Sequence, residues 1–257
     1  MKLIFEGIQN INDEYIINFE QDSVDDIISV VKPTIYKSNF YDNLYWFGYK
    51  FNNNISSSER THFINWLKGI NGNPTQHELD TIIAKPVNAL IKEIGFDSIK
   101  LIIYPESQRS KLVNSIIDVI GSVLPHNIKG STISVIKNIP SQIEFDWDLF
   151  DKQFTGNEIS YKQTQEFVNG TLLPAIHKLD YFSIAKNVKP KYRPFIQNYL
   201  TIDNIKSKNI LDCIVNNRAI LIVDDINTSG STLKELIRLV KTLDSKSDIY
   251  IFTLIGK

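Results

Sequence analysis

The sequence predicts an α/β protein with a mainly parallel sheet flanked by helices, and three observations lead to this prediction. Residues 219–223, AILIV, form an unbroken apolar run, which is typical of a strand buried on both faces of a parallel sheet. Residues 98–104, SIKLIIY, indicate a second strand. A polar loop and then apolar residues at helical spacing follow each strand. Strands that alternate with helices in this way favour a parallel sheet.

The first 74 residues have a different pattern, which predicts an N-terminal α+β extension. Residues 2–5 and 15–19 are typical of short strands. Ser56 and Glu59 form a capping box, which predicts the start of a helix. The strongest break in the chain is GINGNP, which ends at Pro74. We therefore expect an extension over residues 1–74, as a hood or an oligomerisation part, and a core over residues 75–257.

The segment 41–51, YDNLYWFGYKF, is densely aromatic and predicts a further strand or hairpin. Its rings could stack on a planar base, or they could form the core of a small β-rich subdomain. Aromatic side chains dominate protein cores, so the second interpretation is favoured. The same strand is also a candidate surface for a homodimer.

The core predicts alternating helices and strands. We expect helices at residues 77–94, 112–123 and 163–179, and strands at residues 98–104, 131–137 and 248–255. Pro86 should kink the first helix, and Gly170 and Pro174 should weaken the third. Between residues 138 and 160 the pattern loosens over a length that is unusual for a structureless connection.

Composition indicates a globular protein with a real core, at 42% hydrophobic and 22% charged residues. The net charge of -1 gives no electrostatic reason to expect nucleic acid or an anionic membrane as partner. The one cysteine, Cys213, leaves no intramolecular disulfide, and the four histidines have no metal-ligand spacing. The chain lacks a signal-peptide pattern and an apolar run of membrane-spanning length, so we expect a cytoplasmic protein.

The most informative stretch is AILIVDDINTSGSTL, in which Asp224 and Asp225 follow the apolar run. The start of the next helix offers free N–H groups and the positive end of a dipole, which suits a phosphate. Gly230 lets the backbone approach that phosphate closely. Two adjacent carboxylates can accept hydrogen bonds from vicinal sugar hydroxyls. The stretch therefore predicts a ribose 5-phosphate site, although a buried strand before an ordinary capped helix would share part of the pattern.

Residues 220–232 resemble the phosphoribosyl-pyrophosphate (PRPP) motif of type I phosphoribosyltransferases. That motif has four apolar residues, two acids, two variable residues, two small or hydroxyl residues, Gly, any residue, and Thr or Ser. Every constrained position fits. The resemblance implies that Asp224 and Asp225 are the catalytic residues and hold the ribose hydroxyls. It further implies a loop that holds the 5-phosphate and consists of Asn227, Thr228, Ser229, Gly230, Ser231 and Thr232. Asn227 is polar where many members of the family are apolar.

The resemblance also implies a pyrophosphate-binding loop after the first core strand. The residues at that position are Glu106, Ser107, Gln108, Arg109, Ser110 and Lys111. Arg109 and Lys111 could neutralise a diphosphate, and the two serines could donate hydrogen bonds to it. The alternative is a solvated loop. We favour the binding loop, because ligands of α/β proteins gather at the carboxyl ends of strands.

The resemblance implies a type I phosphoribosyltransferase-like core and a Mg²⁺-dependent enzyme of nucleotide metabolism. Such an enzyme transfers ribosyl 5-phosphate from PRPP to a nitrogenous base or related acceptor and releases pyrophosphate. The alternative is a non-catalytic regulator that senses PRPP or a nucleotide, or an interaction protein of the same fold. Because the last strand ends near the C-terminus, we expect the acceptor-selecting hood within residues 1–73 or 138–191. The basic segment 186–193 is either a diphosphate or partner contact or a solvated connector, and the connector is favoured.

Overall fold

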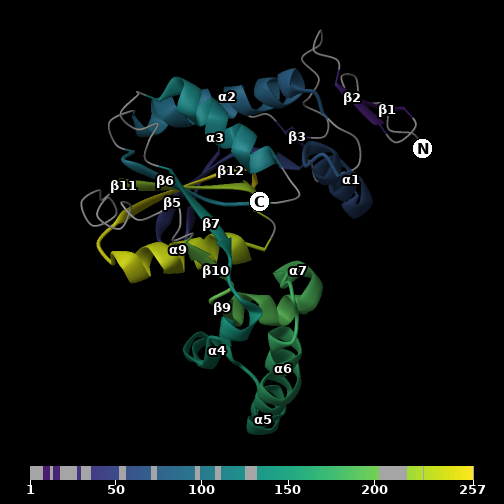
Figure 1. The fold of residues 1–257 in the computed structure, drawn as a ribbon, viewed down its shortest axis with the longest axis vertical. Helices are drawn as coiled ribbons and strands as arrows, with labels where there is room; N and C mark the ends of the chain where they lie inside the picture. Colours follow the sequence, from purple (N-terminus) through teal and green to yellow (C-terminus); the bar gives the residue numbers. More distant parts are fainter. Residues whose placement is uncertain are drawn as a thin grey trace.

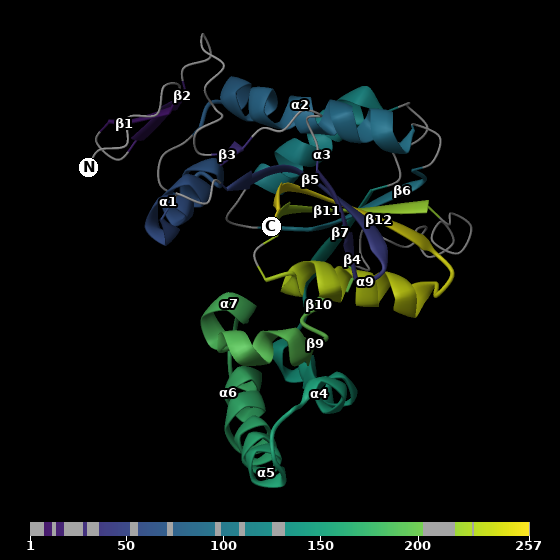
Figure 2. The same ribbon diagram turned by 180° about the vertical axis from the view of Figure 1, so that it is seen from behind.

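The computed structural model of this chain contains a mixed, mainly parallel β-sheet with helices on both faces (Figures 1 and 2). It describes residues 8–11, 14–17, 28–29, 36–51, 56–70, 74–95, 99–107, 111–124, 132–202, 219–227 and 229–256. None of the helices in these ranges is both long and apolar enough to span a membrane.

The main sheet has eight strands within the described residues. Their order is β10 (Leu200–Ile202), β7 (Thr132–Lys137), β6 (Leu101–Pro105), β11 (Ala219–Ile226), β12 (Asp248–Gly256), β5 (Asn43–Phe51) and β3 (Ile28–Ser29), with β4 (Tyr36–Phe40) also paired to β5. The strands from β7 to β5 are parallel, whereas β10, β3 and β4 run antiparallel to their neighbours. The predicted α/β class with a mainly parallel sheet is confirmed.

The helices α2 (Gln76–Ile94) and α3 (Leu112–Val123) cover one face of the sheet, and α9 (Ser231–Leu243) covers the other (Figure 1). Along β11, Leu221 and Val223 belong to the apolar layer under α2 and α3. Ile220 and Ile222 belong to the layer that faces α9. Both faces of β11 are thus buried, which explains why its sequence is apolar without alternation.

The predicted core elements are found close to their expected positions. The expected helices at 77–94 and 112–123 correspond to α2 and α3, and Pro86 stands inside α2. The expected strands at 98–104, 131–137 and 248–255 correspond to β6, β7 and β12. The hydrophobic periodicity of these segments was therefore a sufficient guide to their type.

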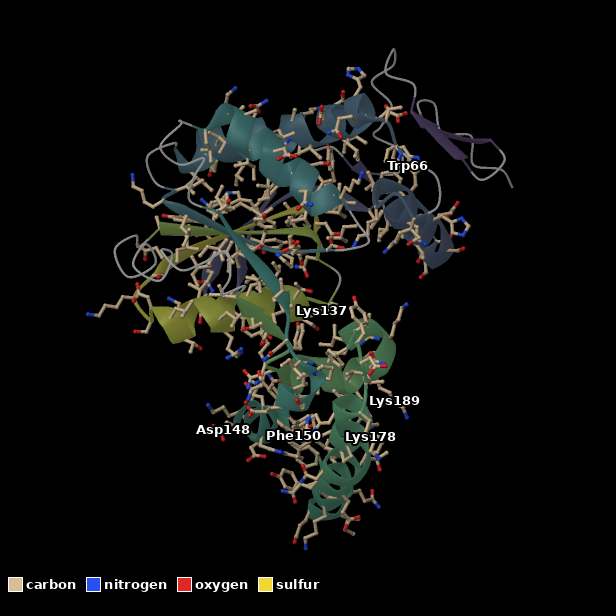
Figure 3. The ribbon with its side chains drawn as sticks, viewed as in Figure 1. Trp66, Lys137, Asp148, Phe150, Lys178 and Lys189 are labelled. Atoms are coloured by element: carbon tan, nitrogen blue, oxygen red, sulfur yellow. The ribbon has the colours of Figure 1, made fainter. Side chains whose placement is uncertain are left out.

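A helical insert, residues 138–199, leaves the sheet after β7 and returns to it through β10 (Figures 1 and 2). Its elements are η3 (Pro140–Gln142), β8 (Glu144–Phe145), α4 (Trp147–Gln153), α5 (Glu158–Phe167), η4 (Val168–Leu172), α6 (Leu173–His177), α7 (Ile184–Asn187), η5 (Pro190–Phe195) and β9 (Ile196–Gln197). Figure 3 shows Lys137 where the insert meets the sheet, and Phe150 and Lys178 within it. The segment 138–160 is therefore structured despite its loose pattern.

The expected helix at 163–179 is divided among α5, η4 and α6. The π-helical turn η4 immediately precedes the turn that contains Pro174. Proline has no backbone N–H, and its ring clashes with the carbonyl group four residues earlier, so a wider turn relieves the conflict. The π-helical turn thus interrupts the helix next to Pro174, where the sequence predicted that the helix is weak.

The N-terminal part contributes directly to the main sheet. β5 runs parallel to β12, so the sheet crosses the expected boundary at residues 74 and 75. Tyr45, Trp46 and Phe47 are buried, in the core of this sheet rather than in that of a separate subdomain. The backbone of β5 is paired on both sides, with β12 and with β4 and β3.

Other N-terminal predictions concern smaller elements. The capping box is confirmed at the start of α1 (Ser57–Leu67), because the Ser56 side chain accepts from the Glu59 N–H and the Glu59 side chain accepts from the Ser56 N–H. β1 (Ile8–Ile11) and β2 (Glu14–Ile17) form a separate hairpin. The expected strand at 2–5 lies outside the described residues.

The order of the strands reverses between β6 and β11. The chain passes from β6 to β7 on one side, and from β11 to β12 on the other, while β6 and β11 pair directly in parallel. In open α/β sheets, ligands bind outside the carboxyl ends of strands at such a switch point. The residues that follow β6 and β11 therefore lie where such sheets bind their ligands.

Candidate functional site

The acid pair lies at the carboxyl end of β11, beside the carboxyl end of β6. Asp224 and Asp225 are the buried carboxylates of this strand, with 6% and 8% of their surface exposed. The apolar residues before them hold β11 in the centre of the sheet, so the strand delivers both acids to the switch point. The backbone N–H of Asp225 donates to Oδ1 of Asp224 over 2.9 Å.

The two acids differ in their electrostatic environment. Burial, together with the neighbouring Asp225 carboxylate, raises the pKa of Asp224 from 3.8 to about 8, although Lys68 and the Asp225 N–H oppose the shift. Asp224 therefore holds a proton at neutral pH in the free protein. A ligand that requires two carboxylates must displace that proton.

Lys68 is the ion-pair partner of Asp225. Its Nζ lies 2.6 Å from Oδ2 of Asp225, and the side chains are 25% and 11% exposed. Lys68 is the C-cap of α1, where its backbone N–H donates to the Ile64 carbonyl. Burial alone would lower the pKa of Lys68, but the carboxyl groups of Asp225 and Asp224 outweigh burial and raise it. No local pattern in the sequence indicates this contact, because α1 and β11 lie far apart in the chain.

The loop after the acids has the geometry of an anion site. Gly230 adopts a left-handed conformation with φ 72°, and α9 begins at the next residue. Gly230 has no side chain that could accept hydrogen bonds from the first N–H groups of α9. The N-cap residue therefore does not compete with an anion for these groups. The hydroxyl groups of Ser229 and Ser231 are 3.0 Å apart. Thr228 lies outside the described residues, whereas Thr232 lies in the first turn of α9.

The β4–β5 hairpin packs against this loop. The Asn227 amide donates to the Tyr45 hydroxyl over 3.2 Å, and that hydroxyl is 2.8 Å from Oγ1 of Thr253. A Cβ atom on Gly230 would lie only 2.5 Å from the Phe40 ring. The polar side chain of Asn227 thus has a structural partner, the hydroxyl group of the buried Tyr45. Neither Phe40 nor Tyr45 could be assigned to the site from local sequence.

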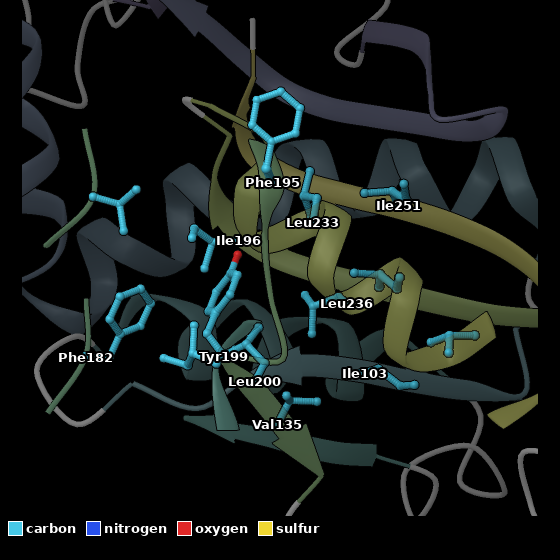
Figure 4. Packing of buried hydrophobic residues seen from close by; sticks show 14 of the residues in the cluster. Ile103, Val135, Phe182, Phe195, Ile196, Tyr199, Leu200, Leu233, Leu236 and Ile251 are labelled. Atoms are coloured by element: carbon cyan, nitrogen blue, oxygen red, sulfur yellow. The ribbon is translucent and has the colours of Figure 1, made fainter. Parts of the chain in front are cut away.

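A buried carboxylate, that of Glu235, lies on α9 shortly after the loop. Glu235 is 2% exposed, and Arg238 donates to both of its carboxylate oxygens, through Nε and Nη2 over 2.9 Å each. Tyr199, which precedes β10, is buried near Leu233 and Leu236 (Figure 4). Burial raises the pKa of the Tyr199 hydroxyl well above its ordinary value, and Glu235 and Asp224 raise it further, against Arg238 and Thr232. Through Tyr199, α9 thus packs against the edge of the sheet at β10.

Lys234 joins α9 to the helical insert. Its ammonium group lies 3.6 Å from Oδ2 of Asp146, and it also donates to the Pro194 carbonyl. Asp146 is the N-cap of α4, where its side chain accepts from the Leu149 N–H. The first turns of α9 are thus in direct contact with the insert.

The expected pyrophosphate loop is described only at its two ends. Glu106 and Ser107 follow β6 at the switch point, and Lys111 is an exposed residue at the N-cap of α3. Gln108, Arg109 and Ser110 lie outside the described residues. The expected pyrophosphate loop and the expected 5-phosphate loop therefore start from neighbouring strands, β6 and β11. The sequence alone does not show that these strands are neighbours.

The basic segment 186–193 has contacts typical of a connector. Arg193 donates through Nε to the Val188 carbonyl and through Nη2 to the Ala185 carbonyl, so its guanidinium group holds the turn after α7. The Lys191 ammonium lies 4.6 Å from the centre of the Tyr192 ring. His177 likewise has a structural contact, 2.8 Å from the Ile143 carbonyl.

The described part of the chain contains no group of three or more His, Cys, Asp or Glu side chains that could hold a metal ion by itself. Comparison with known proteins gives no family for this chain. No protein-family model matches it, and no curated protein is significantly similar to it in sequence.

Proposed function

We propose that this protein binds PRPP at the switch point between β6 and β11 and acts as a phosphoribosyltransferase. The observation on which the proposal mainly depends is the run from Asp224 to Thr232. A buried acid pair at the carboxyl end of a central strand is followed by a left-handed glycine and a helix that no side chain of its N-cap covers. Ribose 5-phosphate has the matching groups, with vicinal hydroxyls at one end and a dianion at the other.

Each part of the site has a task in the proposed reaction. Asp224 and Asp225 accept hydrogen bonds from the ribose hydroxyls and hold the sugar ring still. The loop that contains Gly230 binds the 5-phosphate through backbone N–H and hydroxyl groups. Positive charge develops at the anomeric carbon as pyrophosphate departs, and the nearby carboxylates stabilise it more than they stabilise the ground state. No general base is needed to begin this ionisation.

The residues fit a Mg²⁺ ion that arrives with the substrate. Mg²⁺ is usually held by one or two carboxylates together with phosphate oxygens and water. Asp224 and Asp225 offer two carboxyl groups, and a diphosphate offers the remaining oxygens. Bound there, the ion would neutralise charge on the departing diphosphate.

The helical insert, residues 138–199, is the proposed source of the acceptor-selecting hood. It begins at the carboxyl end of β7, on the side of the sheet where the carboxyl ends of β6 and β11 also lie. Lys234 connects it to the helix that follows the proposed phosphate loop. The acceptor would be a nitrogenous base or a related group.

The contact of Lys234 with Asp146 also favours a second candidate function, that of a PRPP or nucleotide sensor. A ligand that orders the start of α9 would act directly on the insert through this contact. In a sensor, the altered insert would be the output, and no pyrophosphate would form.

Two measurements test the proposal. PRPP with Mg²⁺ at millimolar concentration should raise the melting temperature, because a ligand that binds only the folded state stabilises it. The double variant Asp224→Asn, Asp225→Asn should remain folded and lose this response, since two charge-assisted hydrogen bonds are worth roughly two to four decades of affinity. A folded protein with no response to PRPP would refute the proposal. Pyrophosphate release in the presence of a panel of bases would distinguish the enzyme from the sensor.

A further inference from the structure

Lys68 enters the candidate site from outside the motif that suggested it. The residue ends α1, in the N-terminal part of the chain, yet its ammonium group contacts Asp225 at the end of β11 over 2.6 Å. Figures 1 and 2 show α1 beside the end of β12, the strand next to β11, in both views. The pair thus brings a positive charge to the carboxyl end of β11, where the acids lie.

The position of Lys68 at the end of a helix does not explain this pair. A cation at a helix C-terminus is stabilised by the dipole of its own helix and by the last carbonyl groups. The Lys68 ammonium instead contacts a carboxylate of another element, and both side chains are largely buried. Two buried charges are costly to remove from water, so a pair of this kind is a weak source of stability. A role in binding gives a physical reason for it.

The ammonium group has capacity for a ligand. It has three N–H donors, and Asp225 accepts one of them. A quarter of the Lys68 side chain is exposed, so a group bound at this edge can reach it. A ribose hydroxyl that donates to Asp225 sits on a carbon that is adjacent, or next but one, to C1. A diphosphate on C1 can therefore extend to an ammonium group that contacts Asp225.

We propose that Lys68 determines specificity at this site by binding an anionic substituent on C1 of a ribose 5-phosphate. The inference rests on the proposed function and adds a residue to it. A diphosphate would meet the negative charge of Asp225, and also that of Asp224 once its proton is displaced, and these like charges disfavour its approach. The Lys68 ammonium offsets one of them and donates directly to the diphosphate. Ribose 5-phosphate has a neutral hydroxyl on C1 and gains much less from the ammonium group.

The test compares PRPP with ribose 5-phosphate, both in the presence of Mg²⁺, by calorimetric titration. Lys68→Gln retains a donor toward Asp225 and removes the charge, whereas Lys68→Arg retains both. Lys162→Gln is the matched control, since Lys162 forms an exposed ion pair with Glu158 in the insert. We expect Lys68→Gln to weaken PRPP by about 10- to 100-fold and ribose 5-phosphate by less than about threefold. Lys68→Arg and the control should keep both affinities within about threefold.

A second measurement needs no variant and so does not depend on folding. Lysine side chains are methylated reductively and quantified by peptide mass spectrometry. PRPP should protect Lys68 and ribose 5-phosphate should not, while Lys162 reacts equally in all samples. Equal loss of affinity for both ligands in Lys68→Gln, or equal protection by both, would overturn the inference and leave the proposed function standing. An unaltered protein that binds neither ligand would overturn the proposed function and this inference with it.

Discussion

Replacing Asp224 with asparagine should change how the stability of the protein depends on pH. The side chain is buried at the end of β11, and burial with the neighbouring Asp225 raises its pKa from 3.8 to about 8. Asparagine has nearly the same shape and can occupy the site without ionising. The substitution therefore removes the titration of Asp224 from the folded and the unfolded protein.

The sign follows from the raised pKa. Below pH about 4, both the folded and the unfolded chain bind the proton, and the contribution of Asp224 to stability is fully present. Between pH about 4 and about 8, the unfolded chain has lost the proton and the folded protein has kept it, so stability falls as the pH rises. The loss is about 1.4 kcal/mol for each pH unit and reaches on the order of 5 kcal/mol in total. Above pH about 8 both states are ionised and the loss stops.

The assay is urea unfolding of the wild type and Asp224→Asn at pH 5, 6, 7 and 8. Titrating groups that do not interact with Asp224 are shared, so their effects cancel in the difference between the two free energies of unfolding. That difference should rise in favour of the variant by about 1.4 kcal/mol per pH unit between pH 5 and 7, and by less as the pH approaches the raised pKa. Asp118→Asn, a change on the exposed face of α3, is the matched control. Parallel curves for wild type and Asp224→Asn across this range would refute the reasoning.

Two further predictions concern the loop and its support. Gly230→Ala should cost more than the roughly 1–2 kcal/mol of a left-handed alanine, because the new Cβ would also meet the Phe40 ring. Urea unfolding checks this, and Phe40→Leu combined with Gly230→Ala should restore part of the loss; no restoration would contradict the packing of the hairpin on the loop. Arg238→Met should cost about 3 kcal/mol, since it leaves the buried Glu235 carboxylate without its two donors. The double change with Glu235→Gln should lose clearly less, and an equal loss would show that the pair contributes through packing alone.

The core elements and the acid pair could be predicted from the sequence because their signals are local. The run before Asp224 is apolar at every position, and burial on both faces of β11 requires that pattern. The helical spacing after Gly230 marks α9 for the same reason, since only one stripe of that helix faces the core. The glycine before α9 is also a local signal, because a left-handed residue before a helix favours glycine.

The partners of these residues were decided only by the tertiary structure. The expected boundary at residue 74 separated Lys68 from Asp225 and Tyr45 from Asn227, yet each pair is in contact. The reason is that β5 pairs with β12 in the central sheet, which brings the N-terminal part beside the carboxyl end of β11. An aromatic strand indicates that it will be buried, but its pattern does not say against which strand. Pairing between distant segments depends on which arrangement buries both faces of the sheet, and that is a property of the whole chain.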